Sequence, residues 1–203
     1  MRDAGWSSYG VEVSEPAAQL ARSRNLQVFR GRLQDARFPS ESFDYIRASH
    51  SLEHMASPHE SIDEIHRRLK PGGRVLIAIP NIESLSARIF REHWYHLCPP
   101  VHAFNDSVKT LGRMLSIHGF RLTNVVFNSH YAGIVGSLQI WLNRKNGKES
   151  SRGSRYDNRG LRVVSGWVEK LCDLIRLGDM IEVTAVKAAS RASQAPTDLA
   201  QPA

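Results

Sequence analysis

The sequence predicts an α/β protein whose alternating strands and helices build a doubly wound, parallel sheet. Short β-branched apolar segments recur along the chain, and segments with apolar residues at helical spacing lie between them. Residues 74–79 are almost entirely apolar, as expected for a strand that is covered on both faces. Proline, glycine and capping residues stand at most junctions and indicate where each element begins and ends.

The first half of the chain is expected to supply strands at residues 9–13, 26–29 and 43–49, with a loop at residues 31–42. A helix begins at Ser14, which can cap it, and Pro16 lies in its first turn. A second helix follows Ser57-Pro58-His59-Glu60, which has the pattern of a capping box, and ends at Gly72-Gly73. The strand at residues 74–79 comes next.

The second half is expected to add further helices, two strands and a tail. In chain order these are a helix from residue 85, a helix from Asn105 or Asp106 to Gly119, a strand at 120–127, helical segments at 131–143 and 161–177, and a strand at 180–187. Residues 146–160 have the composition of a mobile loop, and residues 188–203 that of a disordered tail.

Length, composition and charge are typical of a soluble, single-domain protein. The 203 residues are 41% hydrophobic and 23% charged, and no apolar run is long enough to span a membrane. Cys98 and Cys172 lack metal or redox spacing, and the N-terminus lacks a signal pattern, so a cytoplasmic location is expected. The net charge of +7 is concentrated in residues 144–162 without an aromatic platform for stacking bases, so no nucleic-acid partner is expected.

Five short motifs stand in order along the first 80 residues. They are Tyr9-Gly10-Val11-Glu12-Val13-Ser14, Gly31-Arg32-Leu33-Gln34-Asp35-Ala36, Phe43-Asp44-Tyr45-Ile46, Leu52-Glu53-His54 and Lys70-Pro71-Gly72-Gly73. Their types and order resemble class I S-adenosylmethionine-dependent methyltransferases, in particular the group related to the ubiquinone-pathway O-methyltransferases. The resemblance implies a Rossmann-like methyltransferase domain over residues 1–187, a helical insertion at 131–177 before the last strand, and a tail at 188–203.

Glu12 is the first candidate for cofactor binding. A carboxylate at the carboxyl end of the second strand of such a fold can accept both ribose hydroxyls of the cofactor. The alternative is a surface glutamate that is stabilised by the dipole of the following helix. We favour the ribose role because ligands bind where the strands of an open sheet end.

The resemblance places two further segments around S-adenosylmethionine. Asp35 would accept the adenine amino group, with the backbone of Leu33 and Gln34 beside the ring, although Asp35 also fits an ordinary loop residue. Ser49 and His50, at the exit of the strand at 43–49, would line the same pocket.

The glycine-rich loop of the family has no counterpart before Glu12. That loop and its strand should precede the acid by about twenty residues, by analogy with dinucleotide-binding folds, whereas eleven residues precede it here and contain no G-x-G. The sheet is therefore expected to lack its first, central strand. A truncated or misassigned start is favoured over a remnant that no longer binds cofactor, because the remaining motifs are intact.

No metal site is expected, although His50-Ser51-Leu52-Glu53-His54 has metal-like spacing. The motif follows a strand and is separated from the next helix by Ser57-Pro58, which is unlike a zinc-binding helix. The resemblance implies an acid at the position of His50 where relatives bind magnesium, and histidine suits a hard cation poorly.

No single general base is assigned. His50, His54, His96 and His102 are candidates because histidine titrates near neutral pH, with His54 and His102 kept as the catalytic candidates. Methyl transfer depends mainly on alignment and exclusion of water, so a dedicated base is not required. The aromatic, proline-rich residues 94–104 are expected to face the methyl acceptor.

The expected function is methyl transfer from S-adenosylmethionine to a small-molecule or lipid-like acceptor. The alternative is a non-catalytic remnant of the fold that serves as a binding or partner module. Trp141 and Trp167 among basic residues also fit peripheral membrane contact through residues 131–177, against the simpler reading that these helices pack on the sheet. The oligomeric state and the acceptor atom stay open.

Overall fold

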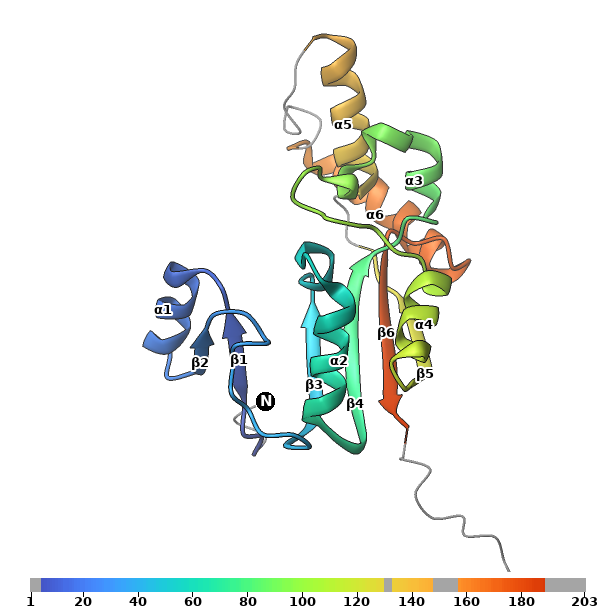
Figure 1. Ribbon diagram of the computed structural model, residues 1–203. Coiled ribbons are helices and arrows are strands. Elements are labelled where there is room, and N and C mark those ends of the chain that lie inside the picture. Colours follow the sequence, from blue (N-terminus) through green and yellow to red (C-terminus); the bar gives the residue numbers. More distant parts are fainter. Residues whose placement is uncertain (1–4, 130–132, 148–156, 189–203) are drawn as a thin grey trace, which may run out of the picture.

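The computed structural model describes residues 5–129, 133–147 and 157–188 (Figure 1). The strands are β1 (Tyr9–Glu12), β2 (Gln27–Arg30), β3 (Phe43–Ser49), β4 (Leu69–Pro80), β5 (Phe120–Phe127) and β6 (Met180–Lys187). The α-helices are α1 (Glu15–Ser23), α2 (Pro58–Arg68), α3 (Leu85–Phe90), α4 (Val108–Ile117), α5 (Gly133–Lys145) and α6 (Arg159–Leu174). Short 3-10 turns η2 (Leu52–His54), η3 (Arg91–His93) and η4 (Tyr95–Leu97) complete the elements.

The strands form a Rossmann-like α/β arrangement that is split into two parts. β1 and β2 pair in parallel, and a second sheet has the order β3-β4-β6-β5. β1, β3 and β4 all point toward the same edge of the fold (Figure 1). The expected wholly parallel sheet is wrong in its last part, because β6 lies antiparallel between β4 and β5. The polypeptide reaches β6 from the end where β4 stops, through α5 and α6, so β6 must run back along β4.

β1 and β3 each have one hydrogen-bonded neighbour and turn their other edges toward one another (Figure 1). No backbone ladder joins them within the part of the chain that the structure describes. Aromatic side chains connect the starts of these strands instead, with the rings of Tyr9 and Phe43 centred 6.0 Å apart and those of Trp6 and Tyr45 6.5 Å apart. The fold thus has two unpaired parallel edges that face each other.

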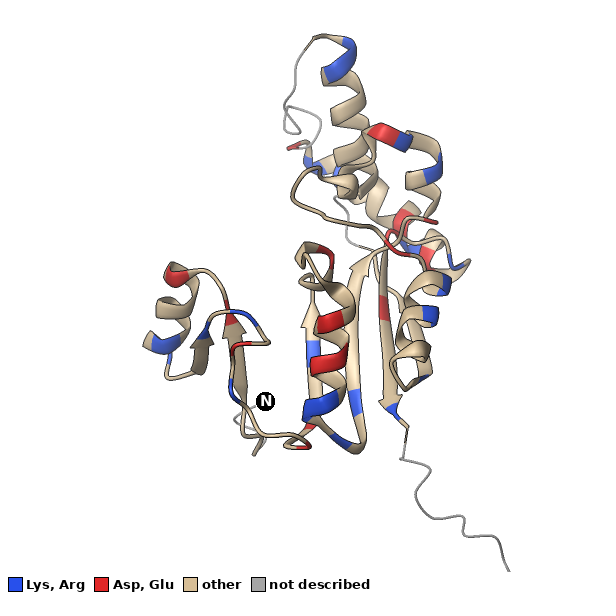
Figure 2. Ribbon diagram, viewed as in Figure 1, with Lys and Arg blue, Asp and Glu red and all other residues tan. Residues whose placement is uncertain are grey.

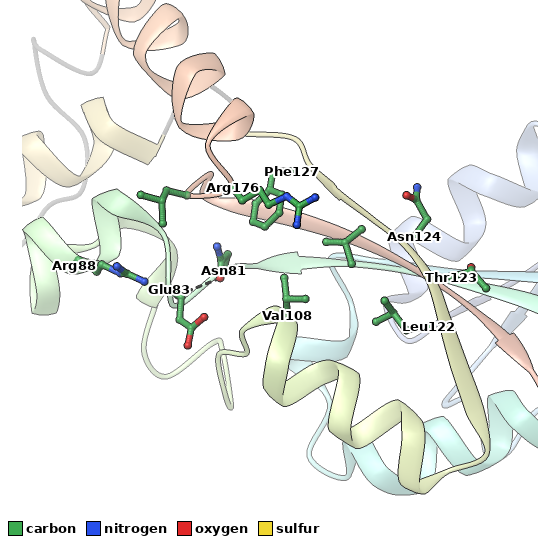
Figure 3. Close-up of a pocket in the computed structure, with 11 residues that line it drawn as sticks. Asn81, Glu83, Arg88, Val108, Leu122, Thr123, Asn124, Phe127 and Arg176 are labelled. Carbon is green, nitrogen blue, oxygen red and sulfur yellow. Dashed lines mark hydrogen bonds between the residues drawn. The ribbon is translucent and has the colours of Figure 1, made fainter.

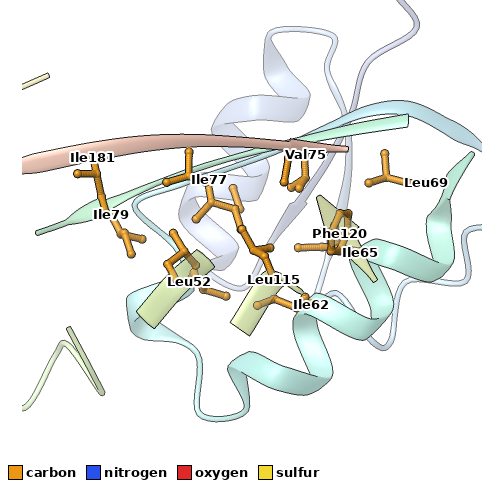
Figure 4. Packing of buried hydrophobic residues seen from close by; sticks show 14 residues of the cluster. Leu52, Ile62, Ile65, Leu69, Val75, Ile77, Ile79, Leu115, Phe120 and Ile181 are labelled. Atoms are coloured by element: carbon orange, nitrogen blue, oxygen red, sulfur yellow. The ribbon is translucent and has the colours of Figure 1, made fainter. Parts of the chain in front are cut away.

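The hydrophobic core lies between the four-stranded sheet and the helices α2 and α4 (Figure 4). Ile62 and Ile65 of α2 and Leu111 and Leu115 of α4 are almost completely buried against β4 and β6. The apolar residues at helical spacing in both helices therefore face the core, as amphipathic helices require. Alternate residues of β6 turn to the opposite face of the sheet, where they are half-exposed.

Several boundaries differ from the sequence expectations. α2 ends at Arg68 rather than at Gly72-Gly73, because Pro71 cannot continue a helix and favours extended backbone in the residue before it. Gly72 instead takes a positive φ of 77° where β4 turns before pairing regularly with β3. Ser14 and Ser57 occupy N-cap positions without a side-chain cap bond, so the predicted capping box at Ser57 is wrong.

A capping box does occur at α4, where Ser107 and Thr110 bond each other's backbone N–H groups. The helix consequently begins at Val108, two or three residues later than expected. Most of the predicted loop at 146–160 and nearly all of the tail at 188–203 lie outside the described residues. Among the residues that are described, no helix is both long and apolar enough to cross a bilayer.

Candidate functional site

Glu12 stands at the carboxyl end of β1, as predicted. Its Oε1 accepts a hydrogen bond of 2.8 Å from the N–H of Ser14, which orients the carboxylate at the start of α1. Its backbone carbonyl accepts a 3.0 Å bond from the N–H of Gly31, the residue that follows β2. This backbone bond holds Glu12 next to the start of the loop after β2.

The loop after β2 is anchored to α2 by a buried arginine. Arg68 is 1% exposed, and its Nη2 donates to the carbonyl oxygens of Leu33, at 2.7 Å, and of Ala36. Gln34 is also bonded to α2, through the hydroxyl of Ser61 at 3.0 Å. Asp35 is exposed at the turn, with its backbone N–H bonded to the carbonyl of Arg32. The segment that was predicted to bind adenine therefore has a backbone that is held by hydrogen bonds, and the side chain of Asp35 is exposed on it.

β3 ends at Ser49, and His50 follows it, at the same edge of the fold as the end of β1 (Figure 1). His50 has a positive φ of 49° and donates its backbone N–H to the carbonyl of Ala78 in β4, at 2.9 Å. This sharp bend leads into η2, where Glu53 is buried with 1% exposure. Nδ1 of His50 lies 3.5 Å from Oε1 of Glu53.

The structure brings together two catalytic candidates that are 48 positions apart. The rings of His54 and His102 are centred 4.8 Å apart in an edge-to-face arrangement. The loop that carries His102 is tied to η2, since the N–H of Ala103 donates to the carbonyl of Glu53 at 2.8 Å. The candidate His96 is not part of this pair but accepts, through its backbone carbonyl, a 2.7 Å bond from Nδ1 of His102.

A buried polar network that the sequence did not indicate joins the helices α5 and α6 to the end of the sheet. Asp179, which is 3% exposed, accepts a bond of 3.1 Å from Nε1 of the buried Trp94 and a shorter one from Ser86. Nearby, the buried Glu169 of α6 accepts a 3.1 Å bond from the N–H of Ile134. Burial, with the negative charges of Asp179 and Asp173, raises the pKa of Glu169 to about 8. Isolated acids in amphipathic segments carry no local pattern that predicts such a network.

A hollow of about 450 Å³ lies elsewhere, between the end of β4, the start of α4 and β5 (Figure 3). Asn81, Arg88 and Arg176 contribute polar groups to it, and Val108 and Leu122 contribute apolar ones. None of the predicted site residues lines this hollow. We therefore regard the edge formed by Glu12, the loop after β2 and the β3 exit as the candidate site.

Comparison with known proteins agrees with this fold. A family described as "Methyltransferase domain" matches residues 1–125. An uncharacterized protein of Methanocaldococcus jannaschii is 31% identical over 83 residues, which cover 41% of this chain and 40% of that protein. The ubiquinone/menaquinone biosynthesis C-methyltransferase UbiE of Escherichia fergusonii is 27% identical over 123 residues, 53% of this chain and 49% of the relative. The chain thus spans less than half the length of these curated relatives.

Solved structures show the same architecture. A S-adenosylmethionine-dependent methyltransferase of Thermotoga maritima, described as a possible histamine N-methyltransferase, superposes with a TM-score of 0.60 at 18% identity, over 89% of this chain and 72% of its own. At this identity the likeness concerns the fold. Together with the match over residues 1–125, it establishes that the chain belongs to the methyltransferase domain family and has the Rossmann-like fold of class I methyltransferases.

Proposed function

We propose that the protein transfers a methyl group from S-adenosylmethionine to a small-molecule or lipid-like acceptor. One observation carries this proposal, namely the common position of three predicted segments at one edge of the fold. Glu12 ends β1, the loop after β2 is bonded to it, and His50 follows β3 at the same edge. Ligands of such folds bind beyond the carboxyl ends of parallel strands.

The residues at this edge fit the adenosine half of the cofactor. The Glu12 carboxylate, oriented through Ser14, can accept ribose hydroxyls, and the exposed Asp35 can accept the adenine amino group. When bound, S-adenosylmethionine supplies an activated methyl group. The role of the chain is then to hold the acceptor in line and to exclude water. The loop from Trp94 to Phe104, which is tied to η2 by the bond from the Ala103 N–H to the Glu53 carbonyl, would face the acceptor.

The unpaired edges of β1 and β3 suggest that the activity requires an additional strand. A parallel strand between β1 and β3 would pair with both and make one continuous sheet. We propose that such a strand, with a glycine-rich loop, is present in the active protein and comes from a longer form of the polypeptide. The same open edges favour the second candidate function, a non-catalytic module that binds a partner's strand there.

Titration of S-adenosylhomocysteine into the folded chain by calorimetry tests these candidates. Binding in the micromolar range supports the enzyme function for this chain itself. Absence of heat from a folded sample, together with binding by a longer form, supports the requirement for the additional strand. If neither form binds, the methyltransferase proposal is overturned in favour of the partner module.

Glu12→Ala should weaken cofactor binding by about 1.5–3 kcal/mol for each lost charge-assisted hydrogen bond, in whichever form binds S-adenosylhomocysteine. Glu15→Ala is the matched control, because this nearby carboxylate is paired with Arg30 at 2.8 Å and has no assigned cofactor contact. Calorimetric dissociation constants of both variants decide the point. Equal affinities for the wild type and Glu12→Ala would exclude the ribose role.

A lipid-like acceptor is supported by an apolar surface on α6. Six residues of one face of α6 are exposed although they are apolar, and the C-cap residue Ile175 is exposed as well. The six are Val163, Val164, Trp167, Val168, Leu171 and Leu174. A hollow of about 560 Å³ opens beside Trp167 and is lined by Arg159, Arg162 and Lys170. The end of α5 is also basic (Figure 2), and Nζ of Lys145 lies 5.5 Å from the ring centre of Trp141.

This combination of apolar and basic groups suits an anionic lipid surface, where tryptophan lies at the interface and cations meet phosphates. We therefore propose that α6 docks on such a membrane. The double variant Trp167→Asp/Leu171→Asp should lose co-sedimentation with phosphatidylserine-containing vesicles, and Ile117→Asp, an equally exposed site on α4, should retain it. Binding that both variants share, or that the wild type lacks, would refute docking through α6.

A further inference from the structure

We infer that Glu53, His54 and His102 form a binding site for a divalent transition metal of the Zn²⁺ class. Their ligand atoms, one from each side chain, all lie within 4.8 Å of one another. The sequence predicted no metal here, because the motif follows a strand and has histidine at position 50, where the resemblance implies an acid. The folded chain adds His102 from a distant loop, and the site stands on this geometry, independently of methyl transfer.

Both imidazole rings are oriented by the backbone in the manner of metal-binding histidines. Nδ1 of His54 lies 3.1 Å from the carbonyl oxygen of Val101, and Nδ1 of His102 lies 2.7 Å from that of His96. A carbonyl oxygen can only accept, so each Nδ1 carries the proton in these bonds. The proton-free Nε2 of each neutral ring then has a lone pair for a metal. A hydrogen bond of this type fixes the tautomer and the ring orientation of most histidine ligands.

The carboxylate of Glu53 is buried without a hydrogen-bond donor among the described residues. The side chain is 2% exposed, and neither Oε1 nor Oε2 accepts a hydrogen bond from a described residue. The nearest basic atom is Nδ1 of His50 at 3.5 Å from Oε1, which is beyond normal hydrogen-bond length. A buried carboxylate without partners is costly, and a cation beside it would remove that cost.

The donor set selects the kind of metal. Two imidazole nitrogens and one carboxylate oxygen are ligands of Zn²⁺ and related transition metals, whereas Mg²⁺ prefers oxygen ligands alone. Two metal–ligand bonds of about 2.0–2.2 Å at a tetrahedral angle place their ligand atoms about 3.3–3.6 Å apart. Ligand atoms that lie up to 4.8 Å apart here would therefore move closer together when the metal binds. His54 is exposed and His102 half-buried, so solvent reaches the site and a further position on the metal stays open to water or to a ligand oxygen.

The backbone holds these three residues together before any metal binds. The Ala103 N–H bonds the carbonyl of Glu53, and the N–H of His102 bonds the carbonyl of Cys98 at 3.1 Å. A bound metal would add a link between η2 and the loop at residues 98–103. It would therefore tie down the loop that faces the proposed methyl acceptor.

The test is metal binding by the full chain, without cofactor, measured by calorimetry with Zn²⁺ and by visible absorption with Co²⁺. One equivalent of each metal should bind, Co²⁺ should give ligand-field bands of a nitrogen and oxygen site, and Mg²⁺ should not compete. His54→Ala and His102→Ala should each weaken binding at least 10–100-fold, the range seen even for supporting residues of metal sites. Glu53→Gln should do the same.

His59→Ala is the matched control, because His59 belongs to a separate histidine pair with His118, at 2.8 Å between ring nitrogens. It should leave Zn²⁺ affinity unchanged. His54 is exposed, so His54→Ala remains informative if Glu53→Gln fails to fold. Failure of the wild type to bind one equivalent of Zn²⁺, or undiminished Zn²⁺ binding by His54→Ala, would overturn the site. The affinity for S-adenosylhomocysteine is measured separately, so a negative result here is distinct from a negative result for the proposed function.

Discussion

Arg68→Leu is expected to lower the free energy of unfolding by about 3–5 kcal/mol, the usual cost of removing one partner from a buried ion pair. Arg68 is 1% exposed, and its Nε donates to Oε1 of Glu64 at 2.6 Å. Its Nη2 donates hydrogen bonds to the carbonyl oxygens of Leu33 and Ala36, and in the variant both oxygens would lose this donor. Leucine retains the apolar part of the side chain, so the loss would reflect the polar contacts.

Arg67→Leu is the matched control for this change. Arg67 binds the same Glu64 carboxylate, at 2.7 Å, but 43% of its side chain is exposed. Surface pairs of this type contribute at most about 1 kcal/mol. Urea unfolding of the wild type and both variants gives the comparison, and similar losses for Arg67→Leu and Arg68→Leu would contradict the role assigned to Arg68.

The same substitution should act on the proposed cofactor site. Arg68 fixes the backbone on either side of Asp35, so Arg68→Leu would release the loop that is expected to contact adenine. We expect weaker S-adenosylhomocysteine binding by Arg68→Leu even under conditions where the variant is folded. Arg67 also bonds this loop, through Ser40 and Phe38, but farther along the chain, and Arg67→Leu should leave that affinity nearly unchanged.

Local patterns predicted most of the secondary structure, and long-range pairing decided the rest. The strand at 43–49 and the strand at 120–127 occur with the predicted bounds, because apolar alternation and flanking glycine or serine define them locally. The direction of β6 could not be read in this way. Its apolar sequence is compatible with either direction, and only the path through α5 and α6 makes it antiparallel.

Some residues of the candidate site could likewise be predicted from local sequence, and others could not. Residues at strand ends, such as Glu12 and His50, could be placed from the sequence because the carboxyl ends of parallel strands meet at one edge. The approach of His102 to Glu53 and His54 could not, since it depends on a loop that folds back over η2. The buried Asp179 and Glu169 escaped prediction because burial of an isolated acid is a property of the packed structure.

Glu169→Gln is expected to make the protein more stable than the wild type at neutral and alkaline pH. Burial first, and then the charges of Asp179 and Asp173, raise the pKa of Glu169 to about 8 in the folded protein, from 4.5 for an ordinary glutamate. Between these values the unfolded chain loses the proton that the folded chain retains, so stability present below pH 4.5 is lost as the pH rises through 8. Glutamine keeps an oxygen for the Ile134 N–H and does not ionise.

The two proteins should therefore have similar melting temperatures near pH 4.5 and should diverge steadily up to about pH 8, beyond which the difference is constant. One proton sets an upper bound of about 1.4 kcal/mol per pH unit, and any contact of the carboxylate with water reduces it. Glu60→Gln, at an exposed position of α2, should instead follow the wild-type curve throughout. Parallel curves for Glu169→Gln and the wild type would mean that Glu169 is already ionised in the folded protein near pH 4.5, and they would refute the raised pKa.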